Sequence, residues 1–211
     1  MIGETMFVSG LAMFLTAPVA GMLSSRLDPR VMMGIGFVGF ALGTWMMTGL
    51  TADWDFYELL IPQVLRGCSL MLCMVPINNI ALGTLPPARI RNASGLFNLT
   101  RNLGGAVGLA VINTVLTQRT DQHYARLSEQ LNFGNWAALD WLNSVGANYD
   151  GYGLDGSQVA IQKLSGIVTQ QSWLLSFIDV FTILTVLFAS LLVLVTLIAK
   201  PSGQAGGGGG H

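Results

Sequence analysis

The 211-residue chain is 52% hydrophobic and only 10% charged, with a mean hydropathy of +0.57, whereas a soluble domain carries about 25% charged residues. This composition excludes an ordinary soluble globular protein and indicates an all-α polytopic membrane protein. The net charge is −1 and the sequence contains no basic patch, so it gives no support to nucleic-acid binding.

Uncharged runs long enough to cross a bilayer occur five times along the chain. About 20 apolar residues span a hydrocarbon core of roughly 30 Å. We therefore expect five transmembrane helices, at residues 5–25, 31–52, 58–85, 93–117 and 172–199. The first four make a block within residues 1–117. Residues 118–171 then form a helical loop before the last span, and the glycine-rich residues 200–211 form a flexible tail.

The second and fourth expected spans each carry a pair of small residues at helical spacing. Gly39 and Gly43 lie four positions apart on one helix face, and so do Gly104 and Gly108. Small residues in this arrangement permit two helices to approach closely. We predict that both pairs serve helix packing.

The third expected span carries polar groups that a simple lipid anchor would lack. Arg66 lies in its outer part, and the pair Asn78 and Asn79 lies near its inner third. A charged side chain at the bilayer centre costs about 2.5–3.5 kcal/mol on insertion scales, so it usually faces protein, a cavity or the interface. We expect Arg66 either to snorkel outward or to face a partner, and at least one asparagine to face the bundle.

The fourth and fifth spans each contain a polar stripe. Asn98 precedes Arg101 by about one helical turn, and such a stripe should face protein. On the last span, one face carries Asp179 within a row of hydroxyls, at Ser172, Ser176 and Thr182. This row would line a water-filled path or meet a cationic partner, for which Arg66 is a candidate. An Asp–Arg pair that only ties helices together is an equal alternative.

Orientation follows from the charges of the short loops. The first loop holds Arg26 and Arg30, the loop near residue 90 holds Arg89 and Arg91, and Lys200 follows the last span. Positive residues mark cytoplasmic loops. The sequence therefore predicts an extracytoplasmic N-terminus, an extracytoplasmic 118–171 segment and a cytoplasmic C-terminus.

Within residues 118–171, two short stretches have apolar residues at helical spacing. One stretch contains Tyr124, Leu127 and Leu131, and the other, around Leu164, repeats the pattern; the turn-rich residues 146–156 lie between them. We predict a small helical hairpin on the outer membrane face, with a disordered loop as the alternative.

The sequence offers no set of residues for catalysis or for binding a metal or cofactor. Cys68 and Cys73 fall inside an apolar run, five positions apart, and are expected to be free buried thiols. His123 and His211 lie far apart in polar segments. We therefore predict neither an enzyme nor a cofactor-binding protein.

Two stretches resemble a known transporter family. The segment Gly21-Met-Leu-Ser-Ser-Arg26-Leu-Asp28-Pro29-Arg30 resembles the loop signature of the major facilitator superfamily, from which it departs at Ser25 and Asp28. The segments Gln63–Pro76 and Asn92–Gly108 resemble the third and fourth of the last five helices of EmrB/QacA-type, fourteen-spanner drug:proton antiporters, especially the EmrB branch.

The resemblance implies that the chain is the C-terminal part of a major facilitator multidrug exporter of the bacterial cytoplasmic (inner) membrane. It would move drugs or other amphipathic small molecules outward, by proton antiport, together with an N-terminal half. A periplasmic adaptor and an outer-membrane channel would complete the path. The residues of the transport cavity or of helix bracing would be Arg66, Asn78, Asn79, Asn98, Arg101 and Asp179. Those of the cytoplasmic gate loop would be Gly21, Arg26, Asp28 and Arg30.

Two other interpretations remain open. The chain could be a non-transporting membrane scaffold whose outer loop binds a partner, or an inactive truncated gene product. Family likeness alone does not establish function, because one fold serves many functions.

Overall fold

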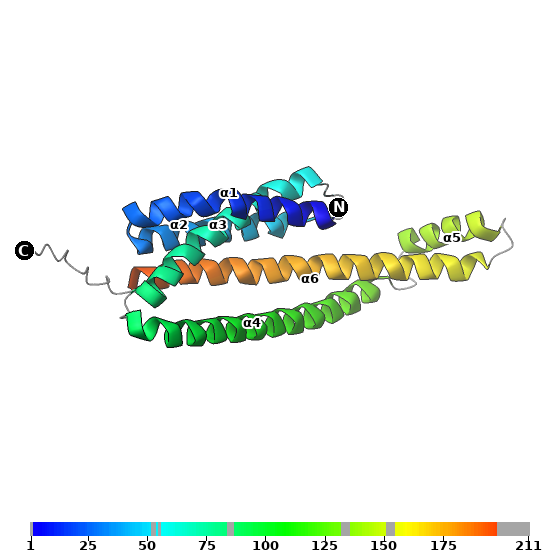
Figure 1. Cartoon of the computed structure of the whole chain (residues 1–211). Helices are drawn as coiled ribbons and strands as arrows, with labels where there is room; N and C mark the ends of the chain where they lie inside the picture. Colours follow the sequence, from blue (N-terminus) through cyan, green and yellow to red (C-terminus); the bar gives the residue numbers. More distant parts are fainter. Residues whose placement is uncertain are drawn as a thin grey trace, which may run out of the picture. The chain divides into compact units, whose positions relative to one another are not determined.

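A computed structural model describes residues 2–51, 54, 56–83, 87–131, 136–150 and 155–197. These residues form helices and the turns next to them, with no strand in the described ranges (Figure 1). The elements are α1 (Ile2–Arg26), α2 (Pro29–Met46), the 3₁₀ turn η1 (Met47–Gly49), α3 (Phe56–Gly83), α4 (Pro87–Gln130), α5 (Trp136–Asp150) and α6 (Gly156–Leu197).

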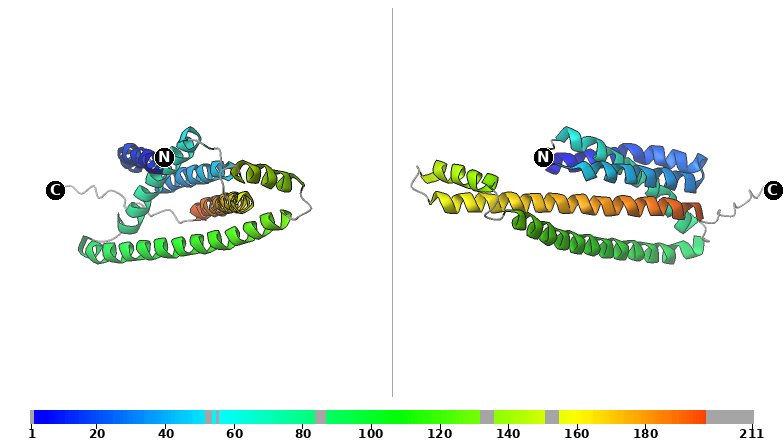
Figure 2. Two further views of the ribbon diagram at one scale, coloured as in Figure 1. Left: turned by 90° about the vertical axis from the view of Figure 1, so that its right-hand side faces the viewer. Right: turned by 180° about the vertical axis from the view of Figure 1, so that it is seen from behind.

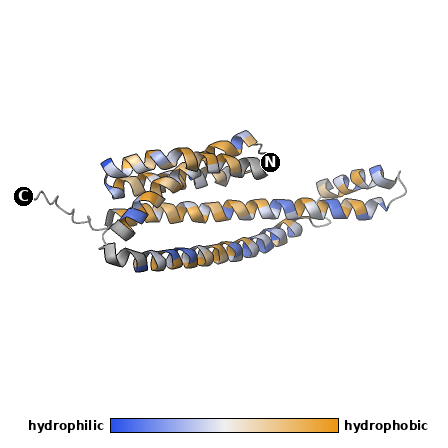
Figure 3. Cartoon of the chain, in the orientation of Figure 1, coloured by the Kyte–Doolittle hydropathy of each residue, from blue (hydrophilic) through white to orange (hydrophobic). Residues whose placement is uncertain are grey.

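Five of these helices are long and apolar enough to cross a membrane, which confirms the predicted all-α architecture with five spans. The candidate spans are Phe7–Arg26, Pro29–Gly49, Phe56–Ala81, Asn92–Gln130 and Gly156–Val195. The apolar character is plain on α1 and on the C-terminal part of α6 (Figure 3).

The segment expected as an outer loop is organised differently. α4 continues to Gln130, and α6 begins at Gly156 rather than near Ser172. Both predicted loop helices are therefore extensions of spanning helices. The reason is local: no glycine or proline interrupts residues 109–130, so nothing stops the helix where its apolar run ends. A hairpin is present, but it is made by α5 and the beginning of α6.

The chain divides into two compact units. The first comprises Met1–Met47, Asp55–Gly104 and Ile183–His211, and the second comprises Thr48–Trp54 and Gly105–Thr182. The long helices α4 and α6 each contribute one part to each unit.

Close contact between α2 and α3 is the basis of the first unit, and these helices lie side by side in Figures 1 and 2. Gly36, Gly39 and Gly43 line the face of α2 that meets α3. A methyl group at Gly36 would run into the Cys73 sulfur and would lie 3.1 Å from the Ser69 carbonyl oxygen. Small residues at helical spacing let two backbones approach in this way. The Gly39/Gly43 pair predicted for helix packing does serve that purpose. At Gly104 and Gly108 of α4, by contrast, an added Cβ would meet no described neighbour within 4 Å.

α1 approaches α3 by the same means. A Cβ at Gly67 would lie 2.8 Å from the Ser9 carbonyl oxygen and 3.0 Å from Ala12 Cβ. One turn along α1, the Thr16 hydroxyl lies 3.1 Å from Cys68 Sγ. Both cysteines are free thiols; Cys73 is buried, as predicted, whereas Cys68 is partly exposed rather than buried.

The C-terminal part of α6 packs on α2 within the first unit. The ring of Phe188 stacks on Phe40, with centroids 4.7 Å apart, and the Thr185 hydroxyl donates a hydrogen bond of 2.9 Å to Thr44. Thr44 is only 2% exposed. Aromatic stacking and one buried hydroxyl pair thus fix the register of these two helices.

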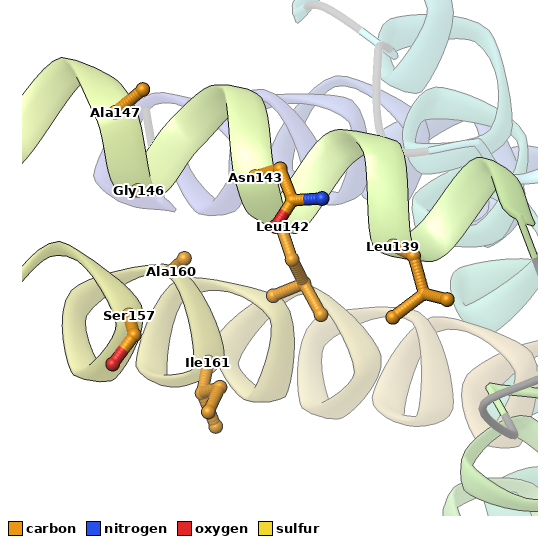
Figure 4. A pocket seen from close by; sticks show the side chains of 8 residues that line it. All are labelled: Leu139, Leu142, Asn143, Gly146, Ala147, Ser157, Ala160 and Ile161. Carbon is orange, nitrogen blue, oxygen red and sulfur yellow. The ribbon is translucent and has the colours of Figure 1, made fainter.

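In the second unit, α4 and α5 each pack on the N-terminal part of α6. Leu139 and Leu142 of α5 point toward α6 and line a groove of about 330 Å³ together with Ala160 and Ile161 (Figure 4). Asp155 caps the start of α6: its Oδ1 accepts hydrogen bonds from the Ser157 hydroxyl, at 2.7 Å, and from the Gln158 backbone N–H, at 3.4 Å.

We predict that Gly36→Ala destabilises the chain by about 1–3 kcal/mol, the usual cost of overpacking, because its methyl group meets the α3 backbone. Gly34→Ala is the matched control on the same helix, since its nearest neighbour is Leu192 Cδ1 at an ordinary 3.7 Å. Thermal unfolding in detergent measures both. Equal midpoints for the two variants would show that the close approach is not needed.

The cap on α6 should depend on pH. The hydrogen bonds from Ser157 and Gln158 hold the pKa of Asp155 below its ordinary value of 3.8. The carboxylate therefore stabilises the helix start above pH 3.8 and loses this effect as pH falls through its lowered pKa. Compared with wild type, Asp155→Ala should exchange the first α6 amides faster at pH 6, and the difference should shrink below pH 3.8. Asp155→Asn, which keeps an acceptor, should show a smaller, pH-independent change at about pH 5–7. Exchange measured by mass spectrometry would refute the cap if Asp155→Ala matched wild type at pH 6.

Candidate functional site

The polar residues of α3 lie at three different positions around its axis. Arg66 is half-buried beside Gly43, whose added Cβ would lie 3.1 Å from Arg66 Cγ. Asn78 is half-buried and Asn79 is exposed. The Asn79 side-chain N–H₂ donates a 2.7 Å hydrogen bond to the Ser24 hydroxyl near the end of α1. The side-chain amide of Asn79 on α3 is thus hydrogen-bonded to a residue of α1.

The predicted gate loop is a tight turn between α1 and α2. α1 ends at Arg26 and α2 begins at Pro29, with Asp28 at the N-cap position but without a side-chain capping bond. Arg26 and Asp28 are exposed, and Gly21 is exposed in open space, since an added Cβ there would meet nothing within 4 Å. Proline at the first helical position favours this abrupt start.

Arg30 differs from its neighbours in this turn. Its Nε and Nη2 atoms are buried and have no hydrogen-bond partner in the described part of the chain. A buried donor left unpaired costs about 1–3 kcal/mol, and more when it carries charge. Arg30 is therefore the residue of the turn with the strongest physical need for a further contact.

Asn98 and Arg101 are both exposed on α4, in the part that belongs to the first unit. The whole stretch of residues 98–111 is exposed. Large apolar side chains alternate with the polar ones here, for example Leu103 at 58% and Val107 at 63% exposure. The protein neighbour expected for this stripe is not among the described residues.

Asp179 sits at the centre of a polar cluster between α6 and α4. Its Oδ2 lies 2.9 Å from His123 Nε2 and 3.6 Å from Arg119 Nε. The His123 side chain is 17% exposed and that of Asp179 is 31% exposed. The sequence predicted either a water path or a cationic partner, and the structure supplies cationic and imidazole partners on α4.

Two of the three hydroxyls in the row with Asp179 are buried in the second unit, whereas Thr182 is exposed. Ser172 and Ser176 are completely buried and donate to the carbonyl oxygens of Val168 and Ser172. Ser176 also accepts a 3.0 Å hydrogen bond from the Thr120 hydroxyl of α4. At Ser172 and Ser176 this face of α6 is therefore a helix–helix seam. Arg66 belongs to the other unit, so its pairing with Asp179 stays a prediction.

The sequence interpretation missed the α4 members of this cluster. Arg119, Thr120 and His123 follow the fourth uncharged run, where the hydropathy pattern predicts a loop. The available signal was that His123 follows Arg119 by four positions and Thr120 by three, which places them near one another on a helix. This spacing is informative only once α4 is known to continue past its apolar segment.

Beyond the cluster, the α4–α6 seam opens into a groove of about 230 Å³. Leu127, Leu131 and Leu164 contribute apolar walls, and Gln130 and Gln171 contribute amides. In the described ranges there is no group of three histidine, cysteine or acidic residues suited to a metal ion. The polar cluster around Asp179 can hold charge and form hydrogen bonds.

Residues 1–125 match the family model of the Major Facilitator Superfamily. The chain belongs to this superfamily. Five apolar helices and this match together make it a multi-pass membrane protein built as part of a major facilitator fold.

Curated relatives cover nearly the whole chain. It is 32% identical to the colistin resistance protein EmrB of Acinetobacter baumannii over 186 residues, which are 88% of this chain and 36% of the relative. It is 30% identical to the multidrug export protein EmrB of Escherichia coli K12, covering 95% of this chain and 38% of that protein. The fatty acid resistance protein FarB of Neisseria gonorrhoeae is 28% identical, with the same shares covered.

The chain spans little more than a third of the length of these relatives. The predicted resemblance to the EmrB branch of the superfamily is therefore confirmed, for a partial chain. These relatives are transporters rather than enzymes.

The contact between Ser24 and Asn79 provides a test of the described geometry. Ser24→Ala and Asn79→Ala should each destabilise the chain by about 0.5–1.5 kcal/mol, the net worth of one hydrogen bond. The double variant should cost no more than one single variant, because both remove the same bond. Asn78→Ala, the adjacent amide on another face of α3, is the control. Fully additive losses in thermal unfolding would contradict the pairing.

Proposed function

We propose that this chain is the C-terminal part of an exporter that moves drug-like, amphipathic small molecules out of the bacterial cell. The observation that carries the proposal is the similarity to a multidrug export protein, a colistin resistance protein and a fatty acid resistance protein over 88–95% of the chain. The same similarity covers only 36–38% of those proteins, so the complete protein would include an N-terminal half.

The exposed residues of α4 support the proposal that the complete protein has an N-terminal half. An exposed arginine and asparagine alternate with exposed leucine and valine along the same helix. Lipid would accept the apolar groups but not Arg101 or Asn98 at membrane depth. A second set of helices, with a polar path between the halves, would satisfy both kinds of side chain. Arg66, Asn78 and Asp179 complete the proposed cavity and bracing residues, together with Asn79.

The gate role is assigned to the turn between α1 and α2. With Arg26 and Arg30 on the cytoplasmic side, the N-terminus and the α4–α6 cluster lie outside and the C-terminus inside, in the inner membrane. The guanidinium atoms of Arg30 that have no partner among the described residues would gain one in only one transport state. A contact of that kind shifts the equilibrium between states. Gly21 and Asp28 shape the same turn.

Proton entry in exchange for drug exit is part of this proposal, as are a periplasmic adaptor and an outer-membrane channel. These follow from the resemblance to EmrB-type exporters. A non-transporting scaffold, or an inactive truncated product, is the competing outcome that the following experiment separates.

We expect the complete transporter, but not this chain alone, to lower the accumulation of fluorescent amphipathic dyes in a pump-deficient Gram-negative strain. Arg101→Gln should slow efflux about tenfold, the effect of losing a state-dependent contact worth about 1.4 kcal/mol. Membrane protein level, measured by immunoblot, should be unchanged. Efflux rates for a cationic and an anionic dye would also define the substrate charge.

Arg126→Gln is the matched control, since Arg126 is exposed on α4 in the second unit, far along the helix from Arg101. It should export normally. Full activity of Arg101→Gln would remove this residue from the cavity. Absence of export by the complete protein, for every dye, would favour the scaffold.

A further inference from the structure

We propose that one face of α4 is the surface on which a helix of the absent N-terminal part docks, and that this helix places a carboxylate opposite Arg101. This polar face is made by Ser94, Asn98, Arg101, Gly105 and Gly108. The inference rests on the proposed export function and deepens it, because it names the face that joins the two parts of the transporter and the chemistry of what covers it.

The polar face is a continuous stripe. α4 is one helix from Pro87 to Gln130, so the side on which a residue lies follows from its position in the sequence. The five residues of the face are spaced by four, three, four and three positions. At 3.6 residues per turn they all lie within an arc of about 80°. Polar and small residues therefore form a line along the helix.

The opposite side of α4 carries large apolar side chains. Leu96, Leu99, Leu103 and Val107 are each 58–66% exposed. Their spacing centres them about 180° from the polar face. Hydrophilic and hydrophobic residues accordingly alternate along this helix (Figure 3). Lipid tails accept the apolar side, which leaves the polar face for contact with protein.

Arg101 determines the chemistry that this contact must have. It lies about 14 Å along the helix from Asn92, near the middle of a hydrocarbon core of roughly 30 Å. An arginine at that depth usually faces protein or water and pairs with another group. Arg101 is exposed, and the ion pairs of the described residues centre on Asp179 instead. A carboxylate matches the fork of a guanidinium best, because it accepts two parallel hydrogen bonds.

The glycines of the face favour a helix rather than a drug molecule as the occupant. An added Cβ at Gly105 or Gly108 would meet nothing within 4 Å. The described neighbours therefore make no use of the missing side chains, whereas Gly36 of α2 is filled by α3. Glycine lowers the stability of a helix interior relative to alanine. Its benefit at such a position is the close approach of a second helix backbone.

One occupant fits both the charge and the chain length. A second copy of this chain would offer the same arginine and no carboxylate, since residues 87–118 contain no acidic residue. Lipid tails offer no hydrogen-bond acceptor. The chain covers only 36–38% of the length of its relatives, so most of the complete protein is available to supply the helix.

The first experiment locates the face by photocrosslinking in the complete transporter, in its membrane. Benzoylphenylalanine replaces either Asn98 on the polar face or Leu103 on the opposite side, and a protease site is inserted just before Met1. After irradiation and cleavage, the probe at Asn98 should join the N-terminal part to this chain. The probe at Leu103 should leave the two parts separate.

A bulky residue should disturb only one side of the helix. Gly108→Leu, with the probe at Asn98, should reduce the yield of crosslinked product several-fold, because the added side chain holds the second helix away. Leu99→Phe, on the lipid side, is the matched control and should leave the yield unchanged. Crosslinks from Leu103 but not Asn98, or products that join two copies of the transporter, would overturn the proposal.

The second experiment identifies the carboxylate by genetic suppression. Arg101→Glu places two like charges together, so dye efflux by the complete transporter should fall at least tenfold. Membrane protein level, measured by immunoblot, should show that the variant is still inserted. Variants that regain efflux should replace an aspartate or glutamate of the N-terminal part with a neutral or basic residue. Normal efflux by Arg101→Glu, or suppressors confined to this chain, would contradict the carboxylate.

Failure of the docking face can be distinguished from failure of the export function. If the complete transporter exports no dye but the probe at Asn98 joins its two parts, the export function fails and the docking face stands. If export is normal and the probe at Asn98 joins only lipid, the docking face fails and the export function stands.

Discussion

Polar side chains placed along membrane-spanning helices must have partners, and this constraint shapes the described structure. Most hydroxyls solve it locally: Ser69 donates to Leu65, and Thr44 to Phe40, each one turn back on its own helix. A hydroxyl satisfied in this way behaves as a small group. Ser69 can therefore lie directly against Gly39 of α2. The close α2–α3 contact depends on this combination of glycine on one side and a self-satisfied hydroxyl on the other.

The number of spans could be predicted because charge is excluded from bilayer-length runs, and this signal is independent of how helices pack. The length of α4 and α6 could not be predicted from the same signal. Hydropathy reports where lipid ends, whereas a helix ends where a breaker or a capping group stops it. Asp155 supplies such a group at the start of α6, well before the apolar run, and no proline separates the two. Residues 118–171 were therefore correctly predicted to be helical. The prediction treated their helices as separate loop helices, whereas they continue α4 and α6.

Individual residues of the candidate site could be predicted from the sequence, but the contacts between them could not. Asp179 attracts attention because it interrupts an apolar stretch, and its need for a cation follows from its charge. Which cation it meets depends on the register of α4 against α6. That register places His123 and Arg119 opposite Asp179, and both lie outside the window in which charge is unusual. A histidine in a polar segment carries no signal until a neighbouring helix supplies its partner.

The polar residues divide into two groups by whether the chain satisfies them. Asn79 and Asp179 have partners on neighbouring helices, so they contribute to the internal packing of each unit. Arg30 has buried donor atoms without a partner in the described residues, and Arg101 is exposed among large apolar side chains. A fixed strut needs its partners at all times, while a contact that changes between transport states is incomplete in at least one of them. The incomplete group is therefore the better place to seek interfaces with the rest of a transporter.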